Sequence, residues 1–104
     1  MGLFEMPQKT ILKEDSKVEI RRPLMYKVII YNDDYTTMEF VVDVLVKIFK
    51  KSDVEALKIM YDVHKKGMGI AGVYVYDIAA TKMAQAISMA RNSGFPLKFS
   101  MEEE

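Results

Sequence analysis

Two spacings of apolar side chains alternate along this chain, and each predicts a different kind of element. Residues 24–31 form a mostly apolar, β-branched stretch in which Val28, Ile29 and Ile30 fill both faces of a strand. In residues 37–50 the apolar side chains recur at the period of an amphipathic helix. The polar residues 32–36 between them are typical of a turn. The pattern therefore predicts a strand, a turn and a helix in succession.

The same spacings predict four more elements. A second helix is expected between Ser52 and Gly67, a strand over residues 70–76, a third helix from Asp77, and a last strand over residues 97–101. An acidic tail over residues 102–104 follows. The order β-α-α-β-α-β predicts an α+β fold of two layers, in which three helices pack on a three-stranded, mostly antiparallel sheet.

Polar side chains mark the expected helix starts. Thr36 with Glu39, and Ser52 with Glu55, each have the spacing of a capping box, in which both side chains satisfy backbone N–H groups. Asp77 can cap the third helix. The buried stripe of that helix is expected at Ile78, Met83, Ile87 and Ala90.

Length and composition indicate one folded domain preceded by an arm. A chain of 104 residues, 50% of them apolar, can bury a single modest core. Residues 1–24 mix charges with isolated apolar side chains and show no sustained period, so we expect a flexible N-terminal arm there and the domain in residues 25–104. From its residues alone, this arm is best interpreted as a tail that only increases solubility.

Charge and cysteine content exclude several functions. Fifteen basic and fifteen acidic residues balance, which gives no reason to expect a nucleic-acid or membrane partner. A solvated helix end explains the lysines at 47, 50, 51, 65 and 66 better than a basic patch does. The chain has no cysteine, which excludes disulfides and cysteine-ligated zinc. We expect a cytoplasmic protein without a cofactor.

The turn after the first strand concentrates chemically useful groups. Asn32, Asp33 and Asp34 supply an amide and two carboxylates, and Met38 and Phe40 follow closely. Polar acceptors beside an apolar surface suit a ligand that is cationic at one end and apolar at the next atom. Asn and Asp are also common in turns for purely local reasons, so this run alone is weakly specific.

His64 is the single histidine of the chain, near the expected end of the second helix. By itself it fits an ordinary, partly exposed histidine at a helix C-terminus. Together with the acidic turn it can act as a neutral hydrogen-bond acceptor or as a general base. A metal site of Asp33, Asp34 and His64 is disfavoured, because adjacent Asp side chains point apart on an extended chain. No nucleophile triad, phosphate loop or metal-ligand spacing is present.

Several short blocks occur in a fixed order over about residues 25–103. They are Tyr26-Lys27-Val28-Ile29, Asn32-Asp33-Asp34-Tyr35-Thr36, Met38-Glu39-Phe40-Val41, Ile59-Met60, Val63-His64, Gly72-Val73-Tyr74, Ile78-Ala79, Thr81-Lys82 and Phe95-Pro96-Leu97. In these blocks the chain resembles the ClpS family of bacterial adaptors, which bring N-end-rule substrates to the ClpAP protease.

The resemblance implies a binding protein rather than an enzyme. Its ligand is the free α-amino group and the bulky first residue (Leu, Phe, Tyr or Trp) of an N-degron protein, and its partner is the ClpA-type AAA+ ATPase. The implied amine-binding groups are Asn32, Asp34 and His64. Thr36 and Met38 form the rim, where Met38 matches the gate against β-branched first residues. The implied side-chain pocket is Val41, Met60, Val63 and Leu97.

The resemblance also implies a docking face and a use for the arm. Asp77 and Lys82 match positions at which the family contacts the ATPase, and the arm is needed to hand substrates over. Two positions depart from the family pattern. Thr37 replaces the usual Pro, and Ala80 replaces the usual Glu, which removes a charge from the docking face.

Two alternatives remain open from the residues. A plain interaction domain of the same element order, like the C-terminal domain of the ribosomal stalk protein, needs no amino-acid pocket. An enzyme that uses Asp34 and His64 as an acid–base pair is the other, although no further catalytic group or cofactor motif accompanies them.

Overall fold

The protein is represented by a computed structural model that describes residues 21–104. The expected arm therefore lies mostly outside the described residues, and its last part, residues 21–24, is exposed and has no regular secondary structure. The elements are β1 (Met25–Tyr31), α1 (Met38–Lys47), α2 (Asp53–Lys66), β2 (Met68–Val75), α3 (Tyr76–Asn92) and β3 (Lys98–Glu103). The predicted order of strands and helices is confirmed.

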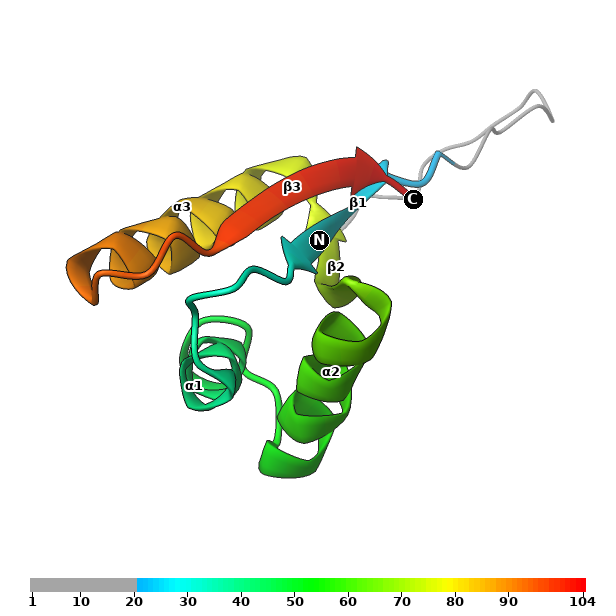
Figure 1. Cartoon of the computed structure of the whole chain (residues 1–104). Coiled ribbons are helices and arrows are strands. Elements are labelled where there is room, and N and C mark those ends of the chain that lie inside the picture. Colours follow the sequence, from blue (N-terminus) through cyan, green and yellow to red (C-terminus); the bar gives the residue numbers. More distant parts are fainter. Residues whose placement is uncertain (1–20) are drawn as a thin grey trace, which may run out of the picture.

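The strands form one antiparallel sheet in the order β2-β1-β3 (Figure 1). β1 is the central strand, which explains its apolar run. Val28 and Ile30 are completely buried, and Ile29 between them is 5% exposed. A strand that pairs on both edges and carries the core on one face has little use for polar side chains at its centre.

All three helices pack on one face of this sheet. Val28 and Ile30 belong to a single cluster of buried residues that includes Val44 and Leu45 of α1, Met60 of α2, and alanines of α3. α1 and α2 pack against each other, whereas α3 lies along the sheet beside β3 (Figure 1). The predicted α+β fold, with helices on a three-stranded sheet, is confirmed.

One capping box is confirmed and the other is wrong. Ser52 and Glu55 form the reciprocal pair of hydrogen bonds at the start of α2. At α1 the cap is Thr37, whose hydroxyl accepts from the backbone N–H of Phe40 at 3.1 Å. The Thr36 hydroxyl instead donates to Asp33 Oδ2 at 2.7 Å, within the turn that precedes the helix.

The start and the buried face of α3 also differ from expectation. The helix begins at Tyr76 directly after β2, so Asp77 lies inside the first turn and no side chain caps the end. Ala79, Ala86 and Ala90 are buried, whereas Ile78 is 48% exposed. The smallest side chains face the sheet, which allows the helix to approach it closely. The expected stripe is therefore wrong at Ile78 and right at Ala90.

The C-terminal strand is longer than predicted. β3 extends to Glu103, so most of the expected acidic tail belongs to the sheet. Glu102 pairs with Lys27 across the sheet, and their charged groups lie 4.0 Å apart. Opposite charges at facing positions explain why acidic residues are tolerated in this edge strand.

Candidate functional site

The turn between β1 and α1 is held together by one carboxylate. Asp33 Oδ1 accepts from the backbone N–H groups of Tyr35 and Thr36 at 2.8 and 2.7 Å, and Oδ2 accepts from the Thr36 hydroxyl at 2.7 Å. Burial by itself raises the pKa of the Asp33 carboxyl, but the hydrogen bonds from Thr36 and Tyr35 outweigh it, so this pKa lies below its ordinary value. Asp33 is therefore ionised and structural.

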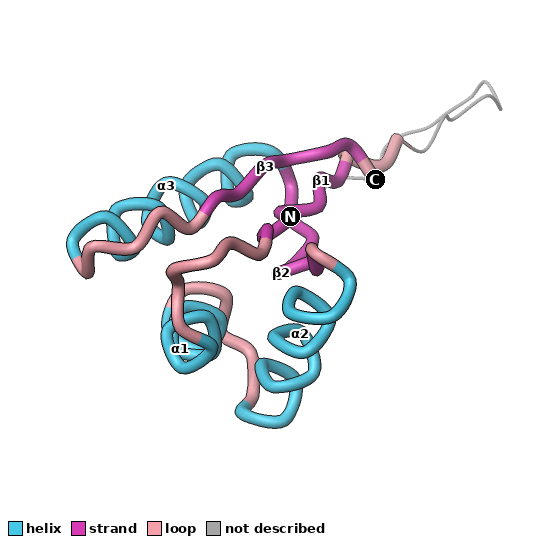
Figure 2. Tube along the Cα trace, viewed as in Figure 1, coloured by secondary structure: helices cyan, strands magenta, loops and turns pink. Residues whose placement is uncertain are grey.

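A backbone contact joins this turn to the end of α2. The N–H of Asn32 donates to the carbonyl oxygen of Gly67 at 2.9 Å, and the N–H of Gly67 donates to the carbonyl of Val63 at 3.0 Å. Gly67 caps α2 with φ of 93°, a conformation that favours glycine. The last turn of α2, which carries His64, is thereby fixed beside Asn32. Figure 2 shows the turn as the loop that leads from β1 to α1.

A pocket of about 310 Å³ lies between this turn, α1 and α2. Its lining residues are Asn32, Asp33, Asp34, Thr36, Met38, Val41, Met60, Val63 and His64. The structure thus brings together the three residues expected to bind an amine, both rim residues, and three of the four residues expected to hold a side chain. They come from the turn, from the start of α1 and from the C-terminal half of α2.

The pocket is polar on one side and apolar on the other. Val41, Met60 and Val63 are buried with exposures of 5, 6 and 2%, and they form its apolar part. Asp34 and His64 are exposed at its polar part. In residues 21–104 the Asp34 side chain makes no hydrogen bond or ion pair, in contrast to Asp33. Its carboxylate therefore remains available to an incoming ligand.

Two residues differ from the expected lining. Leu97 is 1% exposed and belongs to the buried core cluster rather than to the residues that line the pocket. Asp33 lines the pocket although it was expected only as part of the turn or of a disfavoured metal site. Its spacing to Tyr35 and Thr36 is that of an Asx turn, which is the sequence signal for its structural role.

The groups at the polar side can accept hydrogen bonds from a cation. Carboxylate and amide oxygens are acceptors, and a neutral imidazole offers one nitrogen lone pair. Within the described residues, no three acidic or histidine side chains gather as metal ligands would. The disfavoured metal site of Asp33, Asp34 and His64 therefore gains no support.

The residues expected to dock an ATPase lie on α3, away from the pocket lining. Asp77 is exposed in the first turn of the helix. Lys82 is half-buried, and its ammonium donates to the carbonyl oxygen of Ile48 at 2.9 Å and lies 5.5 Å from the centre of the Tyr74 ring. Lys82 therefore holds the C-terminal end of α1 against α3, besides any role at a docking surface.

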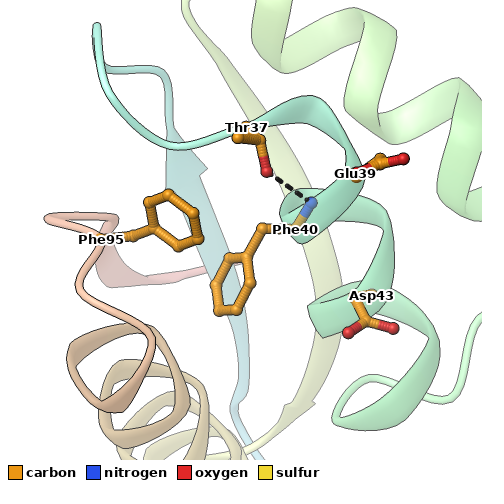
Figure 3. A pocket seen from close by; sticks show the side chains of 5 residues that line it. All are labelled: Thr37, Glu39, Phe40, Asp43 and Phe95. Atoms are coloured by element: carbon orange, nitrogen blue, oxygen red, sulfur yellow. Dashed lines mark hydrogen bonds between the residues drawn. The ribbon is translucent and has the colours of Figure 1, made fainter.

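A second, more open hollow borders the other side of the α1 N-terminus. It has a volume of about 450 Å³ and is lined by Thr37, Glu39, Phe40, Asp43 and Phe95. The Phe40 and Phe95 rings face each other with centroids 4.8 Å apart, and Glu39 points away from them (Figure 3). The Phe40 side chain is buried in the core and packs on Phe95, so this hollow has no apolar cavity beside the carboxylates of Glu39 and Asp43.

In residues 21–104 the fold and this pocket together define a small domain of the α+β class with an amphipathic pocket suited to binding. None of the helices in the described part of the chain has the length and apolar character that crossing a membrane requires.

Comparisons with known proteins place this domain in a family. The family model described as "ATP-dependent Clp protease adaptor protein ClpS" matches residues 21–100. The ClpS adapter of Acetivibrio thermocellus is 52% identical over 99 residues, which cover 95% of this chain and 100% of that protein. The one from Clostridium acetobutylicum is 53% identical over 100 residues, 94% of this chain and 99% of the relative.

A solved structure agrees. Agrobacterium tumefaciens ClpS2 bound to L-phenylalaninamide is similar with a TM-score of 0.76 and 41% identity, over 80% of this chain and 100% of that one. The chain belongs to the ClpS family of ATP-dependent Clp protease adaptors. It is therefore an adaptor and not an enzyme, as expected, and a Clp ATPase is its implied partner.

Proposed function

We propose that this adaptor binds proteins through their free α-amino group and their bulky apolar first residue (Leu, Phe, Tyr or Trp), and delivers them to the ClpA-type ATPase of the ClpAP protease. The observation that carries the proposal is the pocket in which Asn32, Asp34 and His64 lie against Val41, Met60 and Val63. This pairing of acceptors with an apolar cavity matches an N-terminal residue, whose ammonium group and side chain are both bonded to the α-carbon.

The polar half of the pocket suits an ammonium group. An α-ammonium carries a positive charge and three donors, and removing it from water is costly unless acceptors and a negative charge replace its hydration. Asp34 supplies the charge and an acceptor, the Asn32 amide supplies a neutral acceptor, and His64 accepts when it is neutral. Each hydrogen bond to a charged group contributes ~1.5–3 kcal/mol.

The apolar half suits a large side chain. Burying a side chain of the size of Leu contributes ~1.5–3 kcal/mol. Together with the hydrogen bonds to the ammonium, and after the entropic cost of association, this leaves roughly micromolar or tighter binding. In this proposal Thr36 and Met38 form the rim, and Leu97 contributes through the core cluster that it shares with Val41 and Met60.

The solved relative supports the class of ligand. Agrobacterium tumefaciens ClpS2 is described as bound to L-phenylalaninamide. That compound has a free α-amino group and a large aromatic side chain, and an amide in place of its carboxylate, as a protein N-terminus does. We carry the same ligand class over to the pocket of this chain.

Delivery uses other parts of the protein in this proposal. Asp77 and Lys82 of α3 contribute to the surface that docks on the ATPase, and residues 1–24 act as the arm that hands the substrate over. Such an adaptor works where ATP and the protease are, which is the cytoplasm. The proposed domain division is residues 1–24 for the arm and residues 25–104 for the binding domain.

Fluorescence anisotropy with peptides tests the binding step. A Leu-first peptide should bind, and the same peptide with an acetylated N-terminus should bind at least about 100-fold more weakly, because acetylation removes the charge and fills the space. Asp34→Asn should weaken binding of the free peptide, while Asp77→Asn, which changes an exposed carboxylate outside the pocket lining, should leave it unchanged. Equal binding of both peptides would contradict the proposal.

A triple variant separates this proposal from a plain interaction domain. Replacing Asn32, Asp34 and His64 with alanine should abolish capture of Leu-first proteins and leave docking on the ATPase intact. Degradation of a Leu-first reporter by the reconstituted protease measures delivery, and pull-down of the ATPase measures docking. If the triple variant still supports degradation of the reporter, the amino-acid pocket is not the site of recognition.

A further inference from the structure

The helix α2 carries a second apolar face, which is exposed. Its buried residues pack in the core, on the side of the helix that faces α1 and β2. Val54, Leu57 and Tyr61 follow one another at intervals of three and four residues, so they share a different side of the helix. They are 76, 46 and 52% exposed. Single exposed apolar side chains are ordinary, whereas a row of them along one helix face is typical of a surface that binds a partner.

This row leads to the proposed amine pocket. His64 lines the pocket, and it follows Tyr61 by three residues and Leu57 by seven, which places all three on one side of α2. With a rise of 1.5 Å per residue, Tyr61 lies about 4.5 Å and Leu57 about 10.5 Å from His64 along the helix axis. We call Leu57 and Tyr61 the α2 strip. It begins within one helical turn of the pocket.

A bound ligand has to leave the pocket on its open side. In the proposed binding mode the ammonium contacts the polar residues and the first side chain enters the apolar half. The carbonyl carbon bonded to the same α-carbon then points outwards, and the chain continues either over the turn or past His64 over α2. The turn presents the carboxylates of Asp33 and Asp34, whose hydration is costly to remove. Covering the α2 strip releases water from apolar surface, which favours the path over α2.

Chain geometry selects the third residue of the ligand for contact with the α2 strip. Successive side chains of an extended chain point to opposite sides, so the third side chain points towards the protein, as the first does, and the second points to solvent. Two residues of extended chain advance about 6.6 Å. This distance lies between the positions of Tyr61 and Leu57, at about 4.5 and 10.5 Å from His64.

We propose that the α2 strip binds an apolar third residue of the proteins whose first residue occupies the pocket. This inference rests on the proposed function and extends the recognised part of the substrate from one residue to three. L-phenylalaninamide, with which the Agrobacterium tumefaciens relative is described, ends at the amide nitrogen where a second residue would begin. Among substrates with the same first residue, those with an apolar third residue are then bound more tightly.

Peptides that differ at one position test the role of the third residue. Fluorescence anisotropy with the full chain compares three peptides that begin Leu-Ser-Phe, Leu-Phe-Ser and Leu-Ser-Ser and are otherwise identical. The Leu-Ser-Phe peptide should bind at least about five-fold more tightly than Leu-Ser-Ser, because part of the aromatic ring is buried on the strip. The Leu-Phe-Ser peptide should bind like Leu-Ser-Ser. Equal binding of Leu-Ser-Phe and Leu-Ser-Ser would overturn the proposal.

Variants of exposed residues locate the contact. The double variant Leu57→Ser with Tyr61→Ser should bind the Leu-Ser-Phe and Leu-Ser-Ser peptides equally. Val54→Ser is the matched control, because Val54 is exposed on the same side of α2 but lies about 15 Å from His64 along the axis, beyond a third residue. It should keep the preference for Leu-Ser-Phe. If Tyr35→Ser in the turn removes the preference and the double variant keeps it, the ligand leaves over the turn and the proposal is wrong.

The same peptides separate this inference from the proposed function. Binding of Leu-Ser-Ser, compared with its acetylated form, measures recognition of the first residue alone. If the free and acetylated forms bind equally, the proposed function fails and this inference fails with it. If only the free form binds and the third residue has no effect, the inference alone fails.

Discussion

Asp33 and Asp34 are adjacent and chemically identical, but the fold gives them different surroundings. Asp33 accepts three hydrogen bonds from Tyr35 and Thr36 and fixes the turn. Asp34 is exposed at the pocket and has no such bonds within residues 21–104. The structural role of Asp33 and the proposed ligand-binding role of Asp34 therefore fall on different residues, and substitutions can test each role alone.

Asp33→Asn should destabilise the fold, and Asp34→Asn should not. The folded state lowers the pKa of Asp33 below 3.8, so its stabilising contribution is complete above that pH and is lost as the pH falls through the lower folded value. Urea unfolding followed by circular dichroism at neutral and acidic pH measures this. The difference in free energy of unfolding between the wild type and Asp33→Asn should become smaller at acidic pH. A constant difference between them would contradict the assignment.

Met38→Ala should widen the proposed specificity. Met38 is 42% exposed at the first position of α1 and lines the pocket. Removing its side chain creates room beside the first residue of a ligand without harming the helix, because Ala is a strong helix former. Anisotropy with Ile-first and Val-first peptides should show several-fold tighter binding than with the wild type. Unchanged binding of these peptides would mean that Met38 is not the gate.

At the scale of elements, the three helices start in three different ways. Thr37 caps α1 alone, Ser52 and Glu55 form a reciprocal box at α2, and α3 follows β2 without a side-chain cap. The expected cap was right only at α2, where Ser52 and Glu55 have the spacing of the box that forms. At α1 the cap is Thr37, while the Thr36 hydroxyl donates to Asp33 in the preceding turn.

Ser52→Ala should lower the free energy of unfolding by ~1 kcal/mol, since a helix N-cap is lost. Asp77→Ala is the matched control, because Asp77 was also expected to cap a helix but lies within the first turn of α3. Asp77→Ala should lower the free energy of unfolding by less than Ser52→Ala does, because it removes only a favourable negative charge near the helix start. Urea unfolding of both variants provides the comparison, and a larger loss for Asp77→Ala would contradict the described helix starts.

At the scale of the whole molecule, one core supports both sides of the pocket. Val41 and Met60 line the pocket and also belong to the cluster that contains Leu45 and Val28. The pocket floor is thus part of the core that holds α1 and α2 on the sheet. Loosening the core should affect pocket and fold together.

Leu45→Ala should test this coupling. Leu45 is completely buried, and truncation of such a side chain typically costs ~2–5 kcal/mol. Helical signal in circular dichroism and binding of a Leu-first peptide are both measured at increasing urea concentration. In the variant both should be lost in one transition, at a lower urea concentration than in the wild type. Loss of binding well before loss of helical signal would show that the pocket opens independently of the core.

The chain alone determined the order of the elements, because strand and helix periods differ and because a glycine such as Gly67 favours the end of a helix. Together with the resemblance, it also selected the residues of the candidate site. It could not determine which of two adjacent threonines caps α1, which face of α3 is buried, or that β3 includes Glu102. Each depends on contacts with residues distant in the sequence.

Only the tertiary structure joined the turn to His64. The hydrogen bond from Asn32 to Gly67 sets the end of α2 beside the end of β1, and packing of α1 on α2 closes the pocket between them. Sequence patterns report what each segment prefers by itself, whereas a pocket arises from the free energy of packing segments together. For that reason the residue pattern showed the polar turn but did not by itself distinguish Asp33 from Asp34, which only the resemblance separated.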